Sequence, residues 1–512
     1  MPAVSNIIKF IIYYWEVIEM ENREQFGSRI GFILVSAGCA IGMGNVWKFP
    51  YLAGANGGAA FILIYLVFLL ILGIPIMTCE FAIGRGSQLS VGKGLKKLQP
   101  KGTNWSKYGP LALIGNYMLM FFYTMVAGWM LYYAYKTATG QLSGMTPDEV
   151  GADFGGMLGS PGTMIFWTVL VIVLSFGICM MGLQKGVENV TKVMMTLLLI
   201  LMIIVAIRAC TIRGAGAGLR YYLVPDFGKL VENGIGNVCF AAMGQAFFTL
   251  SVGIGSMAIF GSYLGKDRSL FGEAVTITAL DTFVALVAGL IVIPSCFAYG
   301  VEPGAGPSLV FISLPNIFNE MAGGRIWGSL FFVFMSFAAL STVIAVFENI
   351  IGFWNDLWDV ERKKASLINI IIVILGSMPC VLGFNIWAGV HPFGPESGIM
   401  DLEDFIVSNN LLPLGSLLFV LFCCMRYGWG WNSFLEEVNT GSGMKFPALK
   451  GYMLFVLPAI ILIVYIKGCI DFFAGQGLSM TAAIIYEVIV LLIFVYLIFV
   501  HKKDAKPNER TE

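Results

Sequence analysis

The chain has 512 residues, of which 58% are hydrophobic and only 12% charged, and its 31 basic and 31 acidic residues leave no net charge. A soluble domain carries roughly 25% charged residues, so this composition indicates a membrane protein with many spans. Zero net charge argues against nucleic acid as a partner. There are two histidines, His391 and His501, and ten scattered cysteines, of which only the adjacent Cys423 and Cys424 are close. These numbers argue against a haem, a zinc site and a disulfide framework.

Twelve stretches are apolar enough to form membrane-spanning helices, which need about 20 residues each. The predicted spans are residues 29–53, 59–84, 111–135, 163–182, 190–210, 233–262, 272–298, 326–354, 366–384, 401–427, 450–470 and 481–500. Basic residues gather after the second, eighth and last spans, within residues 85–107, 362–364 and 502–503. Because basic loops stay on the cytoplasmic side, we expect both termini to be cytoplasmic and the protein to lie in the cell membrane.

The first 27 residues are expected to form a cytoplasmic segment. The apolar run within residues 1–19 is too short and too interrupted to span a membrane, and no small-residue cleavage site follows it. Two interpretations stay open. Either Met20 is the biological start, or residues 1–19 form a short interfacial amphipathic helix.

Two of the spans carry matching interruptions. The sequence AIGMGN at 40–45 resembles SVGIGS at 251–256, because each has two glycines followed by a polar residue. An unpaired backbone group in hydrocarbon is costly, so a broken helix survives only where protein or a water-filled cavity satisfies it. Matched breaks in two halves are typical of inverted-repeat transporters, whose binding site lies at the breaks. The alternative is that these glycines only let neighbouring helices pack closely.

The matching breaks predict a chain organised in two halves of five helices each. The first repeat takes residues 28–210 and the second 233–427, with an external loop at 211–232 between them. A cytoplasmic loop at 428–449, helices eleven and twelve at 450–501 and a cytoplasmic tail at 502–512 complete the chain.

Polar side chains near the breaks point to ion binding. Freed amides at a helix N-terminus attract anions, and freed carbonyls at a C-terminus attract cations. Asn45, Thr249 and Ser251 stand beside the breaks and could add the oxygen ligands that Na⁺ requires. Ser341 and Thr342 in the eighth span could do the same, or could bond to the carbonyl four residues earlier. Ionisable residues inside spans usually mark ion or substrate pathways, and Glu80, Asp281 and Glu348 lie within apolar helices of this chain.

Four longer motifs resemble those of a known family. GNVWKFPYLAGANGGAAF (44–61), GIPIMTCEFAIGR (73–85), GQAFFTLSVGIGS (244–256) and SLPNIFNEMAGG (313–324) are similar to the signatures of the neurotransmitter:sodium symporters, which include bacterial amino-acid transporters of LeuT type. The resemblance runs from about Arg23 to the twelfth helix. It implies an all-α integral membrane fold of about 12 transmembrane helices, arranged as a LeuT-type 5+5 inverted repeat with unwound helices 1 and 6. It also implies transport coupled to Na⁺, with two ions.

The same resemblance implies a role for individual residues. The first Na⁺ site would use Ala40, Asn45, Thr249 and Asp281, and the second Gly38, Ile41, Ala338, Ser341 and Thr342. The substrate pocket would be lined by Ala40, Met43, Gly44, Leu119, Tyr123, Phe248, Ser251, Ile254, Thr342 and Val346, with the Tyr123 hydroxyl donating to a substrate carboxylate. Lys48 and Asp404 would form the outer gate, and Arg23 and Asp356, near Tyr263, the inner gate. Glu80 would support the unwound part of helix six.

Several positions depart from the pattern of the family. Lys48 stands where the outer gate usually has an arginine, and lysine lacks the bidentate fork of arginine. Thr196 stands ten residues after Gly186, where helix five often has a proline that assists its unwinding. Gly42 occupies the place of an aspartate in amine carriers, so the substrate here is expected to bring its own carboxylate.

A further departure concerns chloride, which animal members typically need. Tyr65 and Gln245 match two of the expected chloride ligands, but Ala285 stands where a helix-seven serine is usual. Asp281 replaces a common asparagine and lies four residues before Ala285, on the same helical face. We therefore expect its carboxylate to replace the anion and transport to be independent of Cl⁻.

The resemblance thus implies a secondary active symporter that imports a neutral apolar or aromatic amino acid with Na⁺ by alternating access. Its partners would be the amino acid, Na⁺ and the lipid bilayer, with no obligate protein partner. Two alternatives remain: an amino-acid sensor of the same fold that does not transport, and an ion channel. We find no nucleophile and base at a workable spacing, so we do not expect an enzyme.

Overall fold

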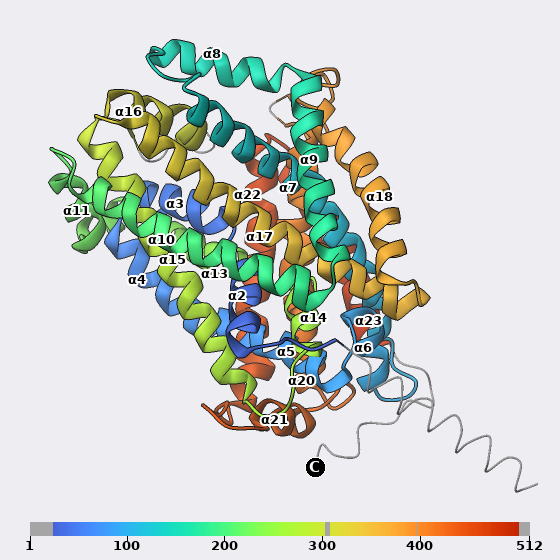
Figure 1. Cartoon of the computed structure of the whole chain (residues 1–512). Helices are drawn as coiled ribbons and strands as arrows, with labels where there is room; N and C mark the ends of the chain where they lie inside the picture. Colours follow the sequence, from blue (N-terminus) through green and yellow to red (C-terminus); the bar gives the residue numbers. More distant parts are fainter. Residues whose placement is uncertain (1–23, 303–307, 396, 501–512) are drawn as a thin grey trace, which may run out of the picture.

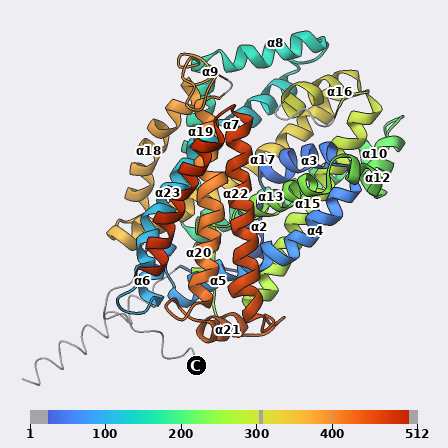
Figure 2. The ribbon, with the colours of Figure 1, turned by 180° about the vertical axis from the view of Figure 1, so that it is seen from behind.

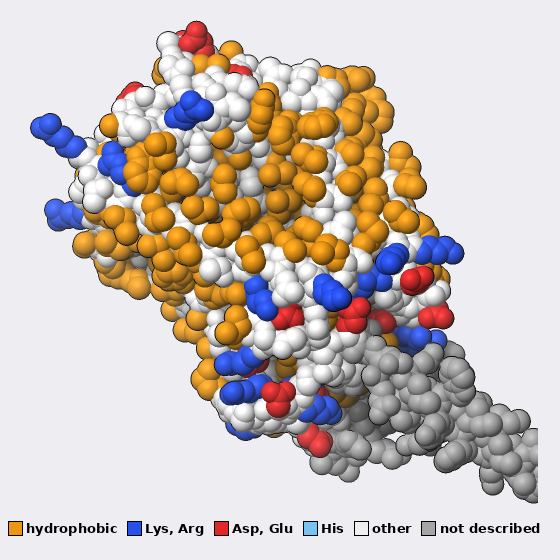
Figure 3. Space-filling view, in the orientation of Figure 1, with side chains coloured by type: hydrophobic (Ala, Val, Ile, Leu, Met, Phe, Trp, Pro, Cys, Tyr) orange, Lys and Arg blue, Asp and Glu red, His pale blue; other side chains and the backbone are white. Residues whose placement is uncertain are grey.

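The computed structural model describes residues 24–302, 308–395 and 397–500, and the elements within these ranges are helices (Figure 1). Residues 1–19, Met20 and Arg23, for which the sequence led to predictions, lie outside the described residues. Figure 3 shows hydrophobic side chains covering the broad middle of one face, with the charged side chains gathered toward its two ends. Such an apolar belt is what a bilayer requires of the surface that faces it.

Nine helices of the described chain are long and apolar enough to cross a membrane. They are Ala59–Ser87 (α4, η2 and α5), Trp105–Thr139 (η3 and α7), Pro161–Met180 (α9), Leu183–Cys210 (η4 and α10), Leu270–Ala298 (α15), Gly324–Trp358 (α17), Arg362–Leu382 (α18), Ile399–Cys424 (α19, η6 and α20) and Tyr452–Gly475 (η7 and α22). A tenth span is bent by 58° between α2 (Arg29–Ala40) and the η1–α3 helix (Gly44–Ala55). The two other predicted spans coincide with α13 and α14 (Ile235–Thr249 and Ser256–Ser262) and with α23 (Met480–Phe499).

Short helices lie outside these spans, and the sequence analysis had treated their segments only as polar connections. They are α6 (Val91–Leu98), α8 (Pro147–Leu158), α11 (Gly216–Leu223), α12 (Phe227–Glu232), η5 with α16 (Leu309–Ser313 and Leu314–Glu320) and α21 (Trp431–Asn439). Local signals explain the start of α8, where Thr146 and Glu149 form a capping box and Pro147 takes the first helical position. The backbone and hydroxyl hydrogen bonds from Thr146 hold the pKa of Glu149 below its ordinary value. In Figure 1, α8 lies across one end of the bundle and α21 lies at the other.

The spans differ in how much of their surface is covered. In α17, 78% of the most apolar window is buried, whereas the windows of α9, α10, α18 and α22 are each 39% buried. The helix α17 packs along α7, and both run through the middle of the bundle (Figure 1). Side chains on these two helices therefore face protein rather than lipid along most of their length.

Both predicted breaks lie where the glycines indicated. The chain leaves the α-helix after Ala40 and again between Thr249 and Ser256. In the second break Ser251, Gly253 and Gly255 have positive φ angles of 50°, 109° and 80°. A Cβ atom at Gly253 would overlap the carbonyl oxygen of Leu412, so both its backbone angle and the close approach of α20 require glycine.

The last two spans stand beside the bundle formed by the others. Figure 2 shows α22 and α23 running next to α20. The helix α22 contacts both α20 and α23. Their seam includes the π-helical segment η6 (Phe405–Leu411), which contacts α22. Helix ten, whose first half holds the predicted gate residue Asp404, is thus supported from outside by helix eleven.

Candidate functional site

Side chains from two neighbouring helices satisfy the backbone of the unwound segment 250–255. Glu80 on α5 accepts hydrogen bonds from the amides of Gly253 and Met257, the second at 3.2 Å. This carboxylate is fully buried and lies at the unwound segment that the resemblance expects it to support. It fixes the amide side of the break.

The carbonyl side of the same break is held from α7 by two residues that the sequence analysis missed. The Tyr108 hydroxyl donates to the Gly253 carbonyl at 2.8 Å, and Asn116 Nδ2 donates to the Ile254 carbonyl at 2.9 Å. Asn349 Nδ2 on α17 in turn donates to Asn116 Oδ1 at 2.8 Å. An asparagine inside an apolar span was the available signal, because a buried amide must find a partner.

Three of the residues predicted for the first ion site converge beside the breaks, and all three are buried. Asn45 Nδ2 donates to Asp281 Oδ1 at 2.8 Å and to Thr249 Oγ1 at 2.9 Å, while Thr249 Oγ1 donates to Asp281 Oδ2 at 3.0 Å. The fourth, Ala40, is the last residue of α2, where carbonyls lose their helical partners. Carboxylate, hydroxyl, amide and carbonyl oxygens are the ligands that a hard cation prefers, so this group could hold Na⁺.

The second predicted ion site is built around Thr342 on α17. Its Oγ1 lies 3.1 Å from the Gly38 carbonyl oxygen and 3.4 Å from that of Ile41, both at the end of α2. It also lies 3.3 Å from the Ala338 carbonyl oxygen, which Ser341 Oγ approaches to 3.0 Å. One hydroxyl hydrogen serves only one of three carbonyls, so lone pairs are left over for a cation. The Thr342 hydroxyl thus lies within reach of a carbonyl of its own helix and of two carbonyls of helix one, which compete for its single hydrogen.

Several of the predicted substrate residues contact the break in helix one. The Tyr123 hydroxyl on α7 accepts from the Met43 amide at 3.1 Å, and a Cβ atom at Gly42 would overlap that hydroxyl. Ser251 Oγ donates to the Cys39 carbonyl at 3.2 Å, which ties the two breaks together. The other predicted lining residues are mostly buried: Ala40, Gly44, Leu119, Ile254, Thr342 and Val346 are buried, and Phe248 is half-buried.

Above these residues, Lys48 and Asp404 do not form an ion pair within 4.0 Å in the described structure. Instead the Lys48 ammonium lies 4.1 Å from the centre of the Phe248 ring, and Asp404 Oδ1 accepts from Ser408 Oγ at 2.6 Å. A cavity of about 340 Å³ opens beside them, lined in part by Lys48, Phe248 and Ser408. Of the two predicted gate residues, Lys48 thus borders an open space, and Asp404 is hydrogen-bonded to Ser408, which also lines it.

The opposite end is closed by a network that only partly matches the predicted inner gate. Tyr263 donates to Glu348 Oε1 at 2.8 Å, and Arg362 binds both oxygens of the same carboxylate at 2.6 and 2.9 Å. Asp356 accepts from the Ser90 amide at 2.5 Å, and its predicted partner Arg23 lies outside the described residues. The sequence analysis used Arg362 only as an orientation marker. A buried carboxylate such as Glu348 needs a positive partner, and this requirement could have predicted its pairing with Arg362.

The first described residues are fastened to the start of helix five at this closed end. Glu188 accepts from the Gly27 amide at 2.7 Å and from Ser28 Oγ at 2.8 Å, and Ser28 caps α2. Helix five begins here with the π-helical segment η4. Thr196 lies well inside α10, where its hydroxyl donates to the Lys192 carbonyl at 2.8 Å.

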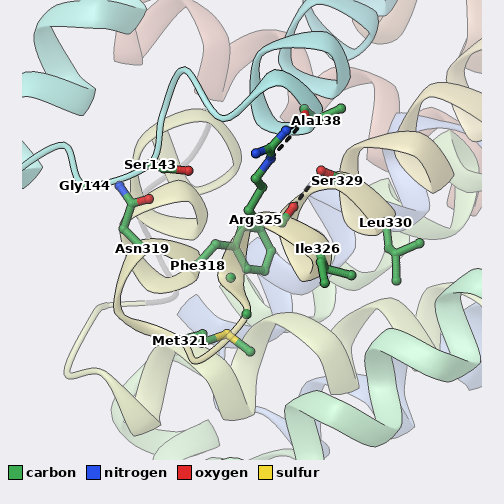
Figure 4. A pocket seen from close by; sticks show the side chains of 12 residues that line it. Ala138, Ser143, Gly144, Phe318, Asn319, Met321, Arg325, Ile326, Ser329 and Leu330 are labelled. Carbon is green, nitrogen blue, oxygen red and sulfur yellow. Dashed lines mark hydrogen bonds between the residues drawn. The ribbon is translucent and has the colours of Figure 1, made fainter.

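A wider hollow lies away from both breaks, among the end of α7, α16 and the start of α17 (Figure 4). Its volume is about 720 Å³. Figure 4 shows the Arg325 guanidinium turned toward the Ala138 carbonyl, to which its Nε donates at 3.0 Å. None of the predicted site residues lines it.

The chain is similar to proteins of known family. The model of the sodium:neurotransmitter symporter family matches residues 23–149 and 153–500. The chain belongs to this family. It is therefore a multi-pass membrane transporter that depends on sodium, and it is not an enzyme.

Members of the symporter family from three domains of life resemble it over most of their length. It is 36% identical to the uncharacterized sodium-dependent transporter YhdH of Bacillus subtilis, over 86% of this chain and 97% of that one. It is 30% identical to a sodium-dependent transporter of Methanocaldococcus jannaschii, over 94% and 98%. Identity to the rat sodium- and chloride-dependent GABA transporter 2 is 25%, over 88% and 81%.

A solved structure of the symporter family has the same fold. The crystal structure of MhsT in complex with L-phenylalanine superposes with a TM-score of 0.77 at 37% sequence identity, covering 87% of this chain and 99% of that one. The all-α, LeuT-type fold expected from the motifs is thereby confirmed.

Replacing Thr342 with alanine is expected to weaken the response to Na⁺, because three carbonyls then lose their shared hydroxyl partner. Losing one such ligand is worth about 1–3 kcal/mol, so half-maximal uptake should need at least about fivefold more Na⁺. Thr342→Ser keeps the hydroxyl and serves as the matched control. The measurement is uptake into proteoliposomes as a function of Na⁺ concentration. An unchanged Na⁺ dependence in Thr342→Ala would contradict the site.

Replacing Asn116 with alanine is expected to loosen the unwound segment, because the Ile254 carbonyl and the Asn349 amide lose their partner. Each orphaned buried group costs about 1–3 kcal/mol. The thermal unfolding midpoint of the purified protein should fall, and substrate affinity should fall with it. Asn237→Ala, at an exposed position, is the control and should leave both unchanged. If the two variants had the same unfolding midpoint and the same substrate affinity, the hydrogen bonds of Asn116 would have no role in holding the unwound segment.

Proposed function

We propose that this protein couples the entry of two Na⁺ ions to the uptake of a neutral apolar or aromatic amino acid by alternating access, without a requirement for Cl⁻. The observation that carries the proposal is the meeting of the Thr342 hydroxyl with three carbonyl oxygens, two of them at the broken end of α2. A group with this surplus of lone pairs in a buried place is suited to a bare cation. The break beside it leaves amides for an anionic group.

The substrate carboxylate would sit at the break in helix one. The Met43 amide already points at the Tyr123 hydroxyl, and that hydroxyl has a hydrogen left to donate. A carboxylate placed here would also lie close to Asn45, and so could complete the oxygen shell of the first ion. The bound amino acid and that ion would then stabilise each other directly.

Coupling follows from which helices each ion joins. An ion at Thr342 would tie α2 to α17, and one at Asn45 would tie the η1 segment to α13 and α15. An ion drives transport only through a difference in its affinity for the two states of the protein. Na⁺ would favour the state in which these helices meet, which is also the state that forms the pocket.

The residue at Gly42 argues for an amino acid rather than an amine. Any side chain there would collide with the hydroxyls of Tyr123 and Thr342, so the protein cannot supply a carboxylate from this position without rearranging both. The remaining wall is apolar, with Leu119, Ile254 and Val346, and burying an unpaired charge against it would be costly. The L-phenylalanine in the MhsT structure agrees with this size and character.

Competition experiments test the substrate class. We expect phenylalanine and leucine to inhibit uptake of a labelled neutral amino acid, and phenethylamine, which lacks the carboxylate, to be at least about 100-fold weaker. Two charge-assisted hydrogen bonds, worth about 1.5–3 kcal/mol each, account for that ratio. Equal potency of the amine would refute the class. Accumulation against a gradient, driven by Na⁺, distinguishes a transporter from a sensor that only binds and from a channel that only conducts.

The charge at Asp281 argues for independence from Cl⁻. Its carboxylate is engaged by Asn45 and Thr249, and Ala285 one turn later contributes no hydroxyl. Tyr65 and Gln245, the two residues that match chloride ligands, are buried in the same region. Even at an effective dielectric of about 20, unit charges 4 Å apart interact by about 4 kcal/mol. One fixed negative charge therefore offsets much of the free-energy cost of bringing a cation into the buried site.

Replacing Cl⁻ with gluconate should leave wild-type uptake unchanged. Asp281→Asn should lose activity or become stimulated by Cl⁻, and the Asp281→Asn, Ala285→Ser double variant should respond more strongly to Cl⁻. Ala285→Ser alone is the control and should remain insensitive to Cl⁻. A collapse of wild-type uptake in gluconate would mean that Asp281 does not replace the anion.

The proposal includes the organisation and orientation inferred from the sequence. Residues 28–210 and 233–427 would be the two repeats, followed by the loop at 428–449 and the last two helices at 450–501. Both termini would lie in the cytoplasm, with the chain in the plasma membrane. The closed end at Glu348 and Arg362 would then face the cytoplasm, and the cavity beside Lys48 would face outward.

A further inference from the structure

A buried carboxyl group on the last helix has no role in the sites described above. Glu487 on α23 is 6% exposed, and neither of its carboxyl oxygens has a hydrogen-bond partner among the described residues. Within those residues no lysine or arginine lies within 4.0 Å of it. A buried polar group without a partner is rare in proteins, and an ionisable one inside a span usually marks a functional place.

The helix presents this group to protein and not to lipid. The buried positions of α23 follow one stripe, at Ala483, Glu487, Phe494 and Ile498, whereas Ile484, Val488 and other residues of the remaining faces are exposed. The stripe packs on α22. Glu487 lies seven residues after the first residue of α23, about 10 Å along the helix.

Two tyrosines and one cysteine lie near the carboxyl group. From α22, the Tyr465 hydroxyl and the Cys469 thiol lie beside it, without hydrogen-bond geometry to its oxygens. From α23 itself comes Tyr486, which donates to Asn410 Oδ1 at 2.8 Å, and Asn410 lies in η6 of helix ten. Tyr465 also reaches Asn410 Oδ1, at a long 3.4 Å. The titratable groups that face Glu487 are thus two tyrosines and one cysteine, none of which is a cation.

We propose that Glu487 is a proton-binding site at the interface of helices ten, eleven and twelve, and that its proton controls the arrangement of helix ten. An isolated carboxylate in this apolar seam is too costly to persist, and none of the described lysines and arginines forms an ion pair with it. A Na⁺ ion would need several oxygens, but Asn410 Oδ1 already accepts from two hydroxyls. A proton needs only the carboxyl group itself.

The Tyr465 hydroxyl provides the link to helix ten. With Glu487 neutral, both tyrosine hydroxyls donate to Asn410 Oδ1, as observed. When the proton leaves, the carboxylate becomes the strongest acceptor nearby, and the weakly held Tyr465 hydroxyl turns to it. Asn410 then loses a partner in the π-helical segment. Its own amide holds the Phe405 carbonyl at 3.0 Å, one residue after Asp404 of the predicted outer gate.

The site lies outside both five-helix repeats, so it can modulate the carrier without occupying either Na⁺ site. Protonation would hold helix ten in the arrangement seen here, and loss of the proton would release it. Uptake should therefore decline as the external pH rises through the titration of Glu487. The inference rests on the proposed transport function only for this uptake readout.

The first experiment measures the proton itself on the purified full-length protein. Infrared spectra collected during a pH titration should show a protonated carboxyl C=O band in the wild type that is absent from Glu487→Gln. Glu232→Gln, an exposed carboxyl on α12, is the control and should retain the band. If the wild type and Glu487→Gln give identical carboxyl bands, Glu487 is ionised and the proposal is overturned.

The second experiment measures the link to helix ten by uptake into proteoliposomes. Wild-type uptake should fall at least about threefold between about pH 6 and about pH 9, a range that includes known titrations of buried glutamates. Glu487→Gln mimics the protonated form and should lose this decline, whereas Glu232→Gln should keep it. Tyr465→Phe should keep the infrared band and also lose the decline, because it removes the hydroxyl that moves from Asn410 to the carboxylate.

The outcomes separate the two claims. A pH profile of Glu487→Gln or Tyr465→Phe that follows the wild type would overturn the control of helix ten. If no form of the protein takes up any amino acid, the proposed function fails, while the infrared titration still decides whether Glu487 binds a proton.

Discussion

The centre of this molecule depends on one constraint: backbone N–H and C=O groups freed inside a membrane span must find partners. In the break at 250–255 the partners are fixed side chains, namely Glu80 for two amides and Tyr108 and Asn116 for two carbonyls. The break in helix one is treated differently, because the carbonyls of Gly38 and Ile41 share the single hydroxyl of Thr342. In the break at 250–255, side chains therefore satisfy the backbone groups named above. In the break of helix one, carbonyl oxygens keep lone pairs that no hydrogen bond uses.

This difference separates the rigid part of the centre from the proposed binding site. The segment held by α5 and α7 has a defined shape before any ligand arrives, which reduces the ordering that binding must supply. The carbonyls at the end of α2 remain available, and the residues around Asn45 gather a carboxylate, a hydroxyl and an amide within hydrogen-bonding distance. A preformed wall on one side and an adaptable oxygen shell on the other suit a site that must release what it binds.

The sequence predicted those features that depend on the local chain. Paired glycines predicted the breaks because only glycine takes the positive φ angle and close packing found at Gly253. The roles of Ser341 and Thr342 came from the family resemblance, since their residue types alone also fitted back-bonding. Tyr108, Asn116 and Arg362 were missed because their partners lie more than ten residues away, and hydropathy does not show which helix faces face each other. The helices α8 and α16 were missed because polar composition had marked their segments as loops.

The uneven burial of the spans has a mechanical consequence. The bilayer touches α9, α10, α18 and α22 over most of their apolar surface, but it reaches little of α17. Lipids therefore contact mainly these outer helices, while the helices that meet at the breaks move mainly against protein. A membrane of different thickness would strain these outer helices first and would affect the proposed ion sites only through them. The helices that meet at the breaks are thus separated from the lipid by an outer layer of helices, and this outer layer adapts to changes in the membrane.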